Sequence, residues 1–343
     1  MRSNLDITYF RREFAQLAKS YTKRPAIFLG SSALGTVAKS DGARVAWSRR
    51  YSTSRAVLKR NDPEPFKLGR LLGKGGWGDV PETDLDGTVV ALKRVYFRDT
   101  ARERPRYTNE LGILEKLSGK RHRHIVELIG CYELPSQRFY QLGLLIWPVA
   151  QCDLSAYLGY LDTLQKSTVF RTANKHTVLL EIFHEEKDAL DEICRLLGIS
   201  LETSTSDRCN SLEERLPEIY ERSRRYLYTI FGCLASATAY LHNDQTIRHK
   251  DIKPSQVRPS SNGLWLTDCG WSLDISELSN SATDNSATVS ARYHAPERVT
   301  RGERYCGRPE DVFWLGCVYL EMINRVCEVP SGNVSAWQGK GFL

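Results

Sequence analysis

The stretch His249-Lys-Asp251-Ile-Lys253-Pro-Ser-Gln256 is the most informative part of this 343-residue sequence. It follows an apolar segment, Tyr226–His242, which is predicted to be a helix. A second informative stretch, Thr267-Asp268-Cys269-Gly270, comes shortly after it, and a glycine-rich segment lies far upstream. Because all three stand in register along the chain, we do not treat the octapeptide as a chance match.

The glycine-rich segment, Gly73-Lys74-Gly75-Gly76-Trp-Gly78-Asp-Val80, lies between two predicted strands, Phe66–Leu72 and Thr88–Tyr96. The pattern G-x-G-x-x-G also occurs in dinucleotide-binding folds, where its glycines open a helix. Here turn-forming residues follow instead: Pro81, Asp84, Asp86 and Gly87. Glycines between two antiparallel strands resemble the loop that covers the phosphates in protein kinases, where no Cβ keeps the backbone from the phosphates.

Two further residues strengthen this resemblance to the protein kinase family. Ala91-Leu-Lys93 matches the family's V-A-I-K pattern, whose lysine contacts the nucleotide phosphates. The segment Tyr107–Leu117 has leucines at helical spacing, with Glu110 beside them. A buried lysine needs a counter-charge, so we expect an ion pair between Lys93 and Glu110.

The octapeptide itself resembles the kinase catalytic loop H-R-D-L-K-P-x-N. The resemblance implies that Asp251 orients or accepts the proton of a substrate hydroxyl, and that Lys253 neutralises charge on the transferring phosphoryl group. Gln256 replaces the asparagine that holds a second Mg²⁺. A lysine two residues after the aspartate is typical of Ser/Thr kinases.

The stretch Thr267–Gly270 resembles the family's D-F-G motif, and Asp268 is then the expected principal Mg²⁺ ligand. The polar sequence up to Ser290 resembles an activation loop, and Ala295-Pro-Glu297 resembles the A-P-E segment. Asp311 resembles the aspartate that braces the catalytic-loop backbone.

The segment Gly143–Val149 resembles the last strand before the hinge between the two kinase lobes, with Trp147 at or next to the gatekeeper position. Ala150 is then expected to offer backbone groups to adenine, and Asp153 to reach the ribose. The histidines His122 and His124 lack acidic or cysteine partners nearby, and we interpret them as structural rather than metal-binding.

The resemblance implies an α+β, two-lobed protein-kinase-like fold. We expect an N-lobe at residues 61–150, with a small antiparallel sheet and one main helix, and a mainly helical C-lobe at 151–330. A helical insert is expected at about 160–222, where Thr177–Leu197 has helical apolar spacing. Residues 1–60 are expected to be a basic, partly disordered extension and 331–343 a disordered tail, so that the C-lobe is incomplete at its C-terminus.

The implied function is transfer of the γ-phosphate of ATP, with Mg²⁺, to Ser or Thr of protein substrates. Four departures leave two alternatives open, a nucleotide-binding pseudokinase scaffold and a truncated inactive kinase fragment. Lys250 replaces the usual arginine, and Gln256 is one methylene longer than asparagine. Pro81 is expected to damage the strand after the glycines, and the last C-lobe helices are expected to be missing.

Charge and cysteine content indicate which partners and which cellular compartment to expect. The net charge of +7 comes from residues 1–60, but the charges there are spread out, so no specific nucleic-acid binding is expected. No membrane span is expected either, because the best candidate apolar run, Leu142–Val149, is far too short. Nine scattered cysteines indicate free thiols inside the cell, in the cytoplasm or nucleus. Arg49-Arg50-Tyr51-Ser52 resembles a mitochondrial processing site, but acidic residues interrupt the extreme N-terminus, so mitochondrial import is the alternative.

Overall fold

The structure is a computed structural model that describes residues 32–60, 62–75, 78–98, 100, 104–136, 139–170, 190–200, 208–261, 263–276, 295–296 and 307–326. Gly76, the activation-loop segment after residue 276, Glu297 and the expected C-terminal tail therefore lie outside the described residues.

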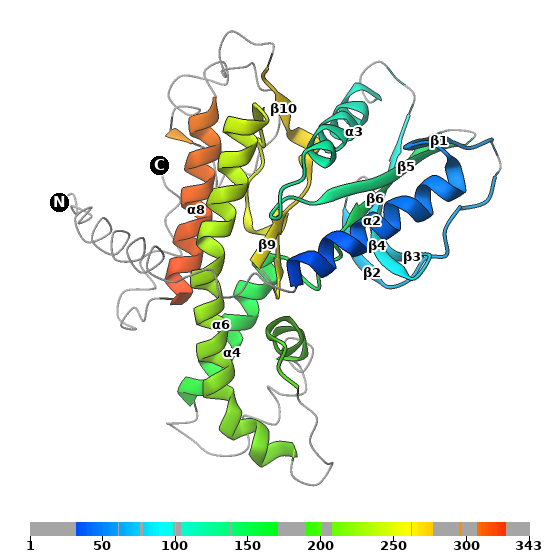
Figure 1. Ribbon diagram of the computed structural model, residues 1–343. Coiled ribbons are helices and arrows are strands. Elements are labelled where there is room, and N and C mark those ends of the chain that lie inside the picture. The colour runs from blue at the N-terminus through cyan, green and yellow to red at the C-terminus, as the bar shows by residue number, and fades with distance from the viewer. Residues whose placement is uncertain are drawn as a thin grey trace. The chain divides into compact units, whose positions relative to one another are not determined.

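The N-lobe is built on a six-stranded sheet with the order β1-β5-β6-β4-β3-β2 (Figure 1). Its strands are β1 (Arg55–Val57), β2 (Leu71–Gly75), β3 (Gly78–Leu85), β4 (Thr88–Phe97), β5 (Glu127–Pro135) and β6 (Tyr140–Trp147). Five strands pair antiparallel, as the sequence predicted, and β1 pairs parallel with β5. The main helix of the lobe, α3 (Arg104–Gly119), contains the predicted helix Tyr107–Leu117.

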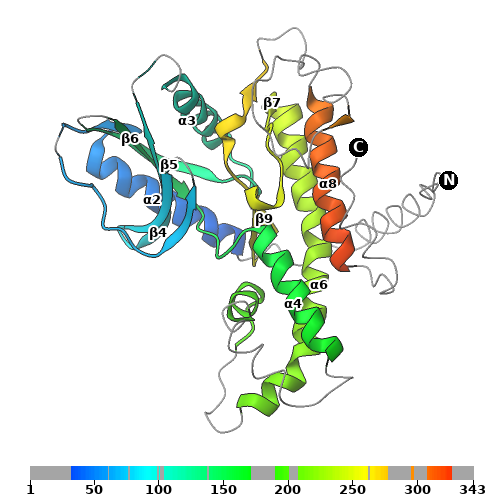
Figure 2. The same ribbon diagram turned by 180° about the vertical axis from the view of Figure 1, so that it is seen from behind.

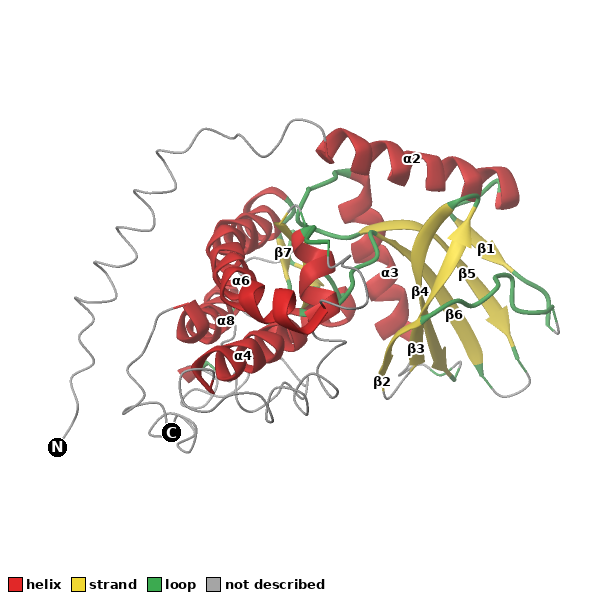
Figure 3. Cartoon of the chain, turned by 90° about the horizontal axis from the view of Figure 1, so that it is seen from below, coloured by secondary structure: helices red, strands yellow, loops and turns green. Residues whose placement is uncertain are grey.

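The N-terminal boundary predicted at residue 61 is wrong, because residues 40–60 are part of the N-lobe. Residues 40–51 belong to helix α2 (Ser32–Tyr51), whose Trp47 is buried against the sheet. The chain then adds β1 to the sheet. Figure 3 shows this part of α2 crossing the sheet. The extension thus supplies both a helix and a strand to the small lobe.

The strand predicted at Phe66–Leu72 begins later, at Leu71. Phe66 is instead buried beside the rings of Trp47 and Tyr132, which holds it out of the strand. The predicted damage at Pro81 is confined to two neighbouring positions of the β3–β4 ladder, Val80 and Pro81. Strand β3 pairs with β4 on both sides of them, at Asp79↔Arg94 and at Glu82↔Ala91, since proline only lacks its own N–H.

In the part of the C-lobe that the structure describes, the long helices are α4 (Leu154–Phe170), α6 (Arg208–Ala239) and α8 (Arg308–Val326), and Figure 2 shows α4 and α8 beside α6. The helix predicted at Tyr226–His242 begins much earlier, at Arg208. It is followed directly by a short π-helix, η1 (Tyr240–Asp244). Part of the insert is therefore the first half of α6. Residues 190–197 form another insert helix, and its apolar residues are buried in the main core: Leu190, Ile193, Cys194 and Leu196.

Short elements after α6 carry the predicted catalytic motifs. They are β7 (Ile247–Arg248), η2 (Pro254–Gln256), β8 (Val257–Ser260), β9 (Gly263–Leu266), η3 (Cys269–Trp271) and β10 (Leu273–Asp274). Strand β7 pairs with β10 and β8 with β9, both antiparallel. These pairings bring the octapeptide beside the segment that holds Asp268. Six cysteines are free thiols: Cys131, Cys152, Cys194, Cys233, Cys269 and Cys317. Within the described residues, no helix is long and apolar enough to cross a membrane.

Candidate active site

Lys93 on β4 is the centre of a partly buried group of charges. Its Nζ lies 2.5 Å from Oε1 of Glu110 on α3 and 2.9 Å from Oδ1 of Asp268. The expected ion pair between Lys93 and Glu110 is therefore present, and Asp268 is a second partner of the same ammonium group. This one lysine links the sheet, α3 and the segment before η3.

The charges in this group fix its protonation states. Burial by itself lowers the pKa of Lys93, but the charges of Glu110 and Asp268 outweigh burial and raise that pKa well above its ordinary value. The Lys93 charge in turn holds the pKa of Asp268 well below its usual range. Lys93 is thus a cation and Asp268 an anion at every physiological pH.

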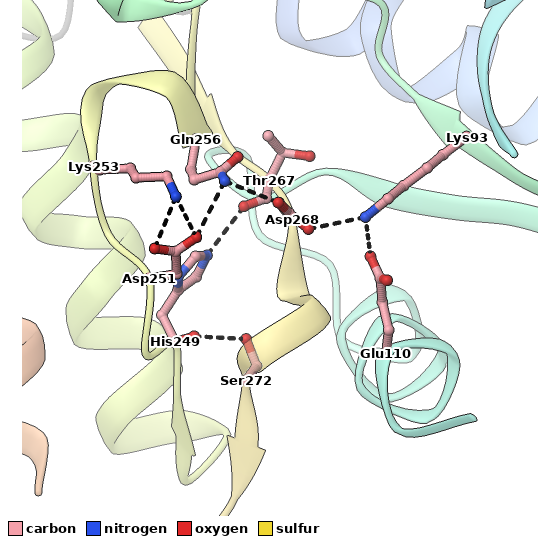
Figure 4. A network of polar contacts seen from close by, with 9 residues as sticks. All are labelled: Lys93, Glu110, His249, Asp251, Lys253, Gln256, Thr267, Asp268 and Ser272. Carbon is pink, nitrogen blue, oxygen red and sulfur yellow. Dashed lines mark hydrogen bonds and ion pairs between the residues drawn. The ribbon is translucent and has the colours of Figure 1, made fainter. Parts of the chain in front are cut away.

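A second lysine and an amide extend the group to the octapeptide (Figure 4). Lys253 Nζ donates to both carboxylate oxygens of Asp251, at 3.0 and 2.8 Å. Gln256 Nε2 lies 2.8 Å from Asp268 Oδ2 and 3.3 Å from Asp251 Oδ2. One continuous chain of polar contacts therefore runs from Glu110 through Lys93, Asp268, Gln256 and Asp251 to Lys253.

Asp311 on α8 anchors the backbone of the octapeptide His249–Gln256, the predicted catalytic loop. Its Oδ2 accepts the backbone N–H of His249 at 2.8 Å, and its Oδ1 that of Lys250 at 2.9 Å. The second contact holds Lys250 in the left-handed backbone region, with φ 65°. His242 also donates to Asp311, at 2.8 Å. This bracing of the loop backbone is what the sequence predicted for Asp311.

The segment around Asp268 is tied to the same loop. His249 Nε2 donates to the carbonyl of Thr267 at 3.1 Å, and Ser272 Oγ donates to the carbonyl of His249 at 3.2 Å. Asp268 itself adopts a left-handed conformation, with φ 62°. Cys269, which stands where the family has an aromatic residue, is buried in the core, and burial raises the pKa of its thiol to about 12. It therefore remains a neutral, packed side chain.

Sequence reasoning missed a buried ion pair beneath the loop. Arg248, next to the octapeptide, contacts Glu310 on α8 at 3.1 Å, and both side chains are fully buried. Arg248 and Glu310 are far apart in the sequence, and neither belongs to a motif that would predict their pairing. Together with Asp311 it makes the start of α8 a charged support for the catalytic loop.

The other predicted nucleotide-binding residues lie on the strands and the hinge. Gly73, Lys74 and Gly75 are in β2, Gly78 and Val80 in β3, and Ala91 precedes Lys93 by two residues on the same face of β4. Ala150 follows β6, and Asp153 precedes α4. Asp153 is engaged elsewhere. One of its oxygens accepts the N–H of Ala156 at 2.9 Å as a helix cap, and the other lies 3.5 Å from Arg258, a partner that the sequence did not indicate.

The donor set fits a Mg²⁺ ion that is shared with a nucleotide. Among the described residues no three His, Cys, Asp or Glu side chains come together to hold a metal ion by themselves. Mg²⁺ is commonly bound through only one or two carboxylates, with phosphate oxygens and water as further ligands. Asp268 offers such a carboxylate, kept ionised by Lys93.

Comparisons with known proteins agree with this geometry. The model of the protein kinase domain matches residues 66–338. The chain is 32% identical over 116 residues to the serine/threonine-protein kinase ppk23 of Schizosaccharomyces pombe, an alignment that covers 34% of this chain and 28% of that protein. It is 33% identical over 112 residues to mitogen-activated protein kinase kinase 2 of Arabidopsis thaliana, covering 32% and 30%.

A third relative, the mitogen-activated protein kinase kinase mkk2 of Aspergillus fumigatus, is 28% identical over 182 residues, covering 49% of this chain and 35% of that protein. The chain thus spans about a third of the length of the curated relatives it matches.

Proposed function

This chain belongs to the protein kinase family, and we propose that it is an active Ser/Thr protein kinase that transfers the γ-phosphate of ATP to protein substrates. The observation that carries the proposal is the unbroken chain of contacts from Glu110 to Lys253, which brings together Lys93, Asp268, Asp251 and Lys253, the charged groups with roles in the proposed reaction. The name of one relative, the serine/threonine-protein kinase ppk23, supports the Ser/Thr class.

In this proposal each side chain has one task. Lys93, fixed by Glu110, contacts the phosphates of ATP. Asp251 orients the substrate hydroxyl and takes its proton, while the hydroxyl oxygen bonds to the γ-phosphorus and the bond to the ADP oxygen breaks. Lys253 balances charge on the transferring group. Mg²⁺, held through Asp268 and the phosphates, would neutralise the charge of the triphosphate.

The proposal predicts that Asp251→Asn lowers phosphoryl transfer at least about 100-fold, because a positioned base contributes that much or more. The measurement is transfer of labelled phosphate from ATP to Ser/Thr peptides and to the chain itself, followed by phosphoamino acid analysis. The matched control is Asp162→Asn, which removes a half-exposed carboxylate that pairs with Arg325 between α4 and α8. We expect the control to keep the wild-type rate.

A pseudokinase scaffold is the second candidate, and two observations favour it. The Gln256 amide already bridges two carboxylates, and both oxygens of Asp153 have partners. Binding of ATP and Mg²⁺ without turnover in wild-type protein would establish this candidate instead. Equal transfer rates in wild type and Asp251→Asn would remove Asp251 from the reaction.

A further inference from the structure

The side chain of Gln256 occupies a place between two acidic groups. Asp251 and Gln256 are both buried, at 6% and 8% exposure, and Asp268 has its other oxygen on Lys93. Figure 4 shows the amide of Gln256 pointing at the two carboxylates. Its Nε2 is the atom at 2.8 and 3.3 Å from them.

Hydrogen-bonding capacity determines which end of the amide faces the acids. An ionised carboxylate only accepts hydrogen bonds, and the NH₂ group of glutamine has two donors. If the carbonyl oxygen of Gln256 pointed there instead, it would face two carboxylates that also only accept hydrogen bonds, and none of the three groups could donate to another. Gln256 can therefore offer its oxygen to a cation between these two carboxylates only after it gives up both hydrogen bonds.

We propose that the Gln256 amide substitutes for a cation between Asp251 and Asp268, so that the site takes one divalent ion with a nucleotide rather than two. Lys253 and Lys93 each hold one of the two carboxylates, and the partial positive charge of the two N–H bonds stabilises the space between them without metal. Asp268 remains the ligand for the single ion. The nucleotide-bound part of this inference rests on the proposed function, and the bridging role of the amide does not.

Side-chain length gives a sharp comparison. An asparagine side chain is one carbon–carbon bond shorter, about 1.5 Å, so its amide cannot span both carboxylates from the same backbone position. Gln256→Asn should open the gap to a cation. Gln256→Glu should go further, because it replaces the bridging donor with a third carboxylate.

The first experiment uses Mn²⁺ alone with the full chain. We expect Mn²⁺ to leave the melting temperature of wild type unchanged, to raise that of Gln256→Asn, and to bind Gln256→Glu at least about tenfold more tightly than wild type. Circular dichroism without metal checks that each variant folds. If Mn²⁺ stabilises wild type as much as both variants, the amide does not exclude a cation and the proposal is overturned.

The second experiment counts bound Mn²⁺ by electron paramagnetic resonance, with saturating non-hydrolysable ATP analogue. We expect one ion per wild-type chain and two per Gln256→Asn chain. Two ions in wild type would overturn the proposal. If no variant binds the nucleotide, the proposed kinase activity fails, while the Mn²⁺-only melts still decide the role of the amide.

Discussion

His124 is a buried residue whose charge would be costly. It lies just before β5, is 4% exposed, and its Nδ1 donates to the carbonyl of Leu264 at 3.1 Å. Burial lowers its pKa from the ordinary 6.5 to about 4. Its contacts support the structural role that the sequence predicted, and they connect the N-lobe to β9.

The lowered pKa of His124 makes stability depend on pH. Between pH 6.5 and about 4 the unfolded chain binds a proton at this residue that the folded chain does not bind. The contribution of neutral His124 is therefore complete above pH 6.5 and is lost as the pH falls towards 4. We expect the free energy of unfolding to drop by roughly 1–3 kcal/mol over this range through His124.

Urea unfolding at pH 7 and pH 4.5 measures the effect, with His124→Gln as the matched variant. Glutamine can still donate to the Leu264 carbonyl but does not titrate. The variant should lose less stability on acidification than wild type, while His122 and every other titrating group is common to both. An identical loss in the two proteins would contradict the assignment.

At the scale of elements, β3 depends on a glycine that has no room for a side chain. A Cβ at Gly78 would lie 1.8 Å from the backbone oxygen of Arg94 on β4. A Cβ at Gly73, in β2, would meet no atom within 4 Å. The two glycines belong to the same motif but face different constraints.

We therefore expect Gly78→Ala to push β3 away from β4 and to lower the free energy of unfolding by about 1–3 kcal/mol or more. Because β4 carries Lys93, affinity for ATP should fall as well. Gly73→Ala should leave stability within about 0.5 kcal/mol of wild type. Denaturant unfolding and nucleotide titration of both variants measure this, and equal losses would show that the close contact with Arg94 is unimportant.

How well an element could be predicted depended on how local its signal was. Strand β4 and helix α3 follow from apolar runs within the segment itself, and Lys93 and Glu110 follow from a motif and a spacing. The start of α6 was missed because its first half is mostly polar. Its buried residues Leu216, Ile219 and Tyr220 belong to the same core as the insert helix at residues 190–197. The contacts Arg248–Glu310 and Asp153–Arg258 join residues with no sequence relation, so only the fold reveals them.

At the scale of the whole molecule, the largest surprise is that the extension completes the N-lobe. Among the described side chains of α2, three apolar residues are buried in the core between this helix and the sheet: Ala43, Ala46 and Trp47. Strand β1 is three residues long and pairs parallel with β5. Parallel strands are not joined by a short turn, so no turn motif in the sequence predicts this pairing.

The packing of Trp47 leads to the last prediction. Its ring lies directly on Gly130 of β5, where a Cβ would come within 2.3 Å of it, and its Nε1 donates to the carbonyl of Thr53 at 2.6 Å. Trp47→Ala leaves a cavity between α2 and the sheet, so we expect a loss of about 3–5 kcal/mol in the free energy of unfolding. Val45→Ala, on the same helix but 57% exposed, should change stability by at most about 0.5 kcal/mol. Denaturant unfolding of both variants would contradict an integrated N-terminal helix if Trp47→Ala were as stable as Val45→Ala, since a tryptophan on a detached arm contributes nothing to the sheet.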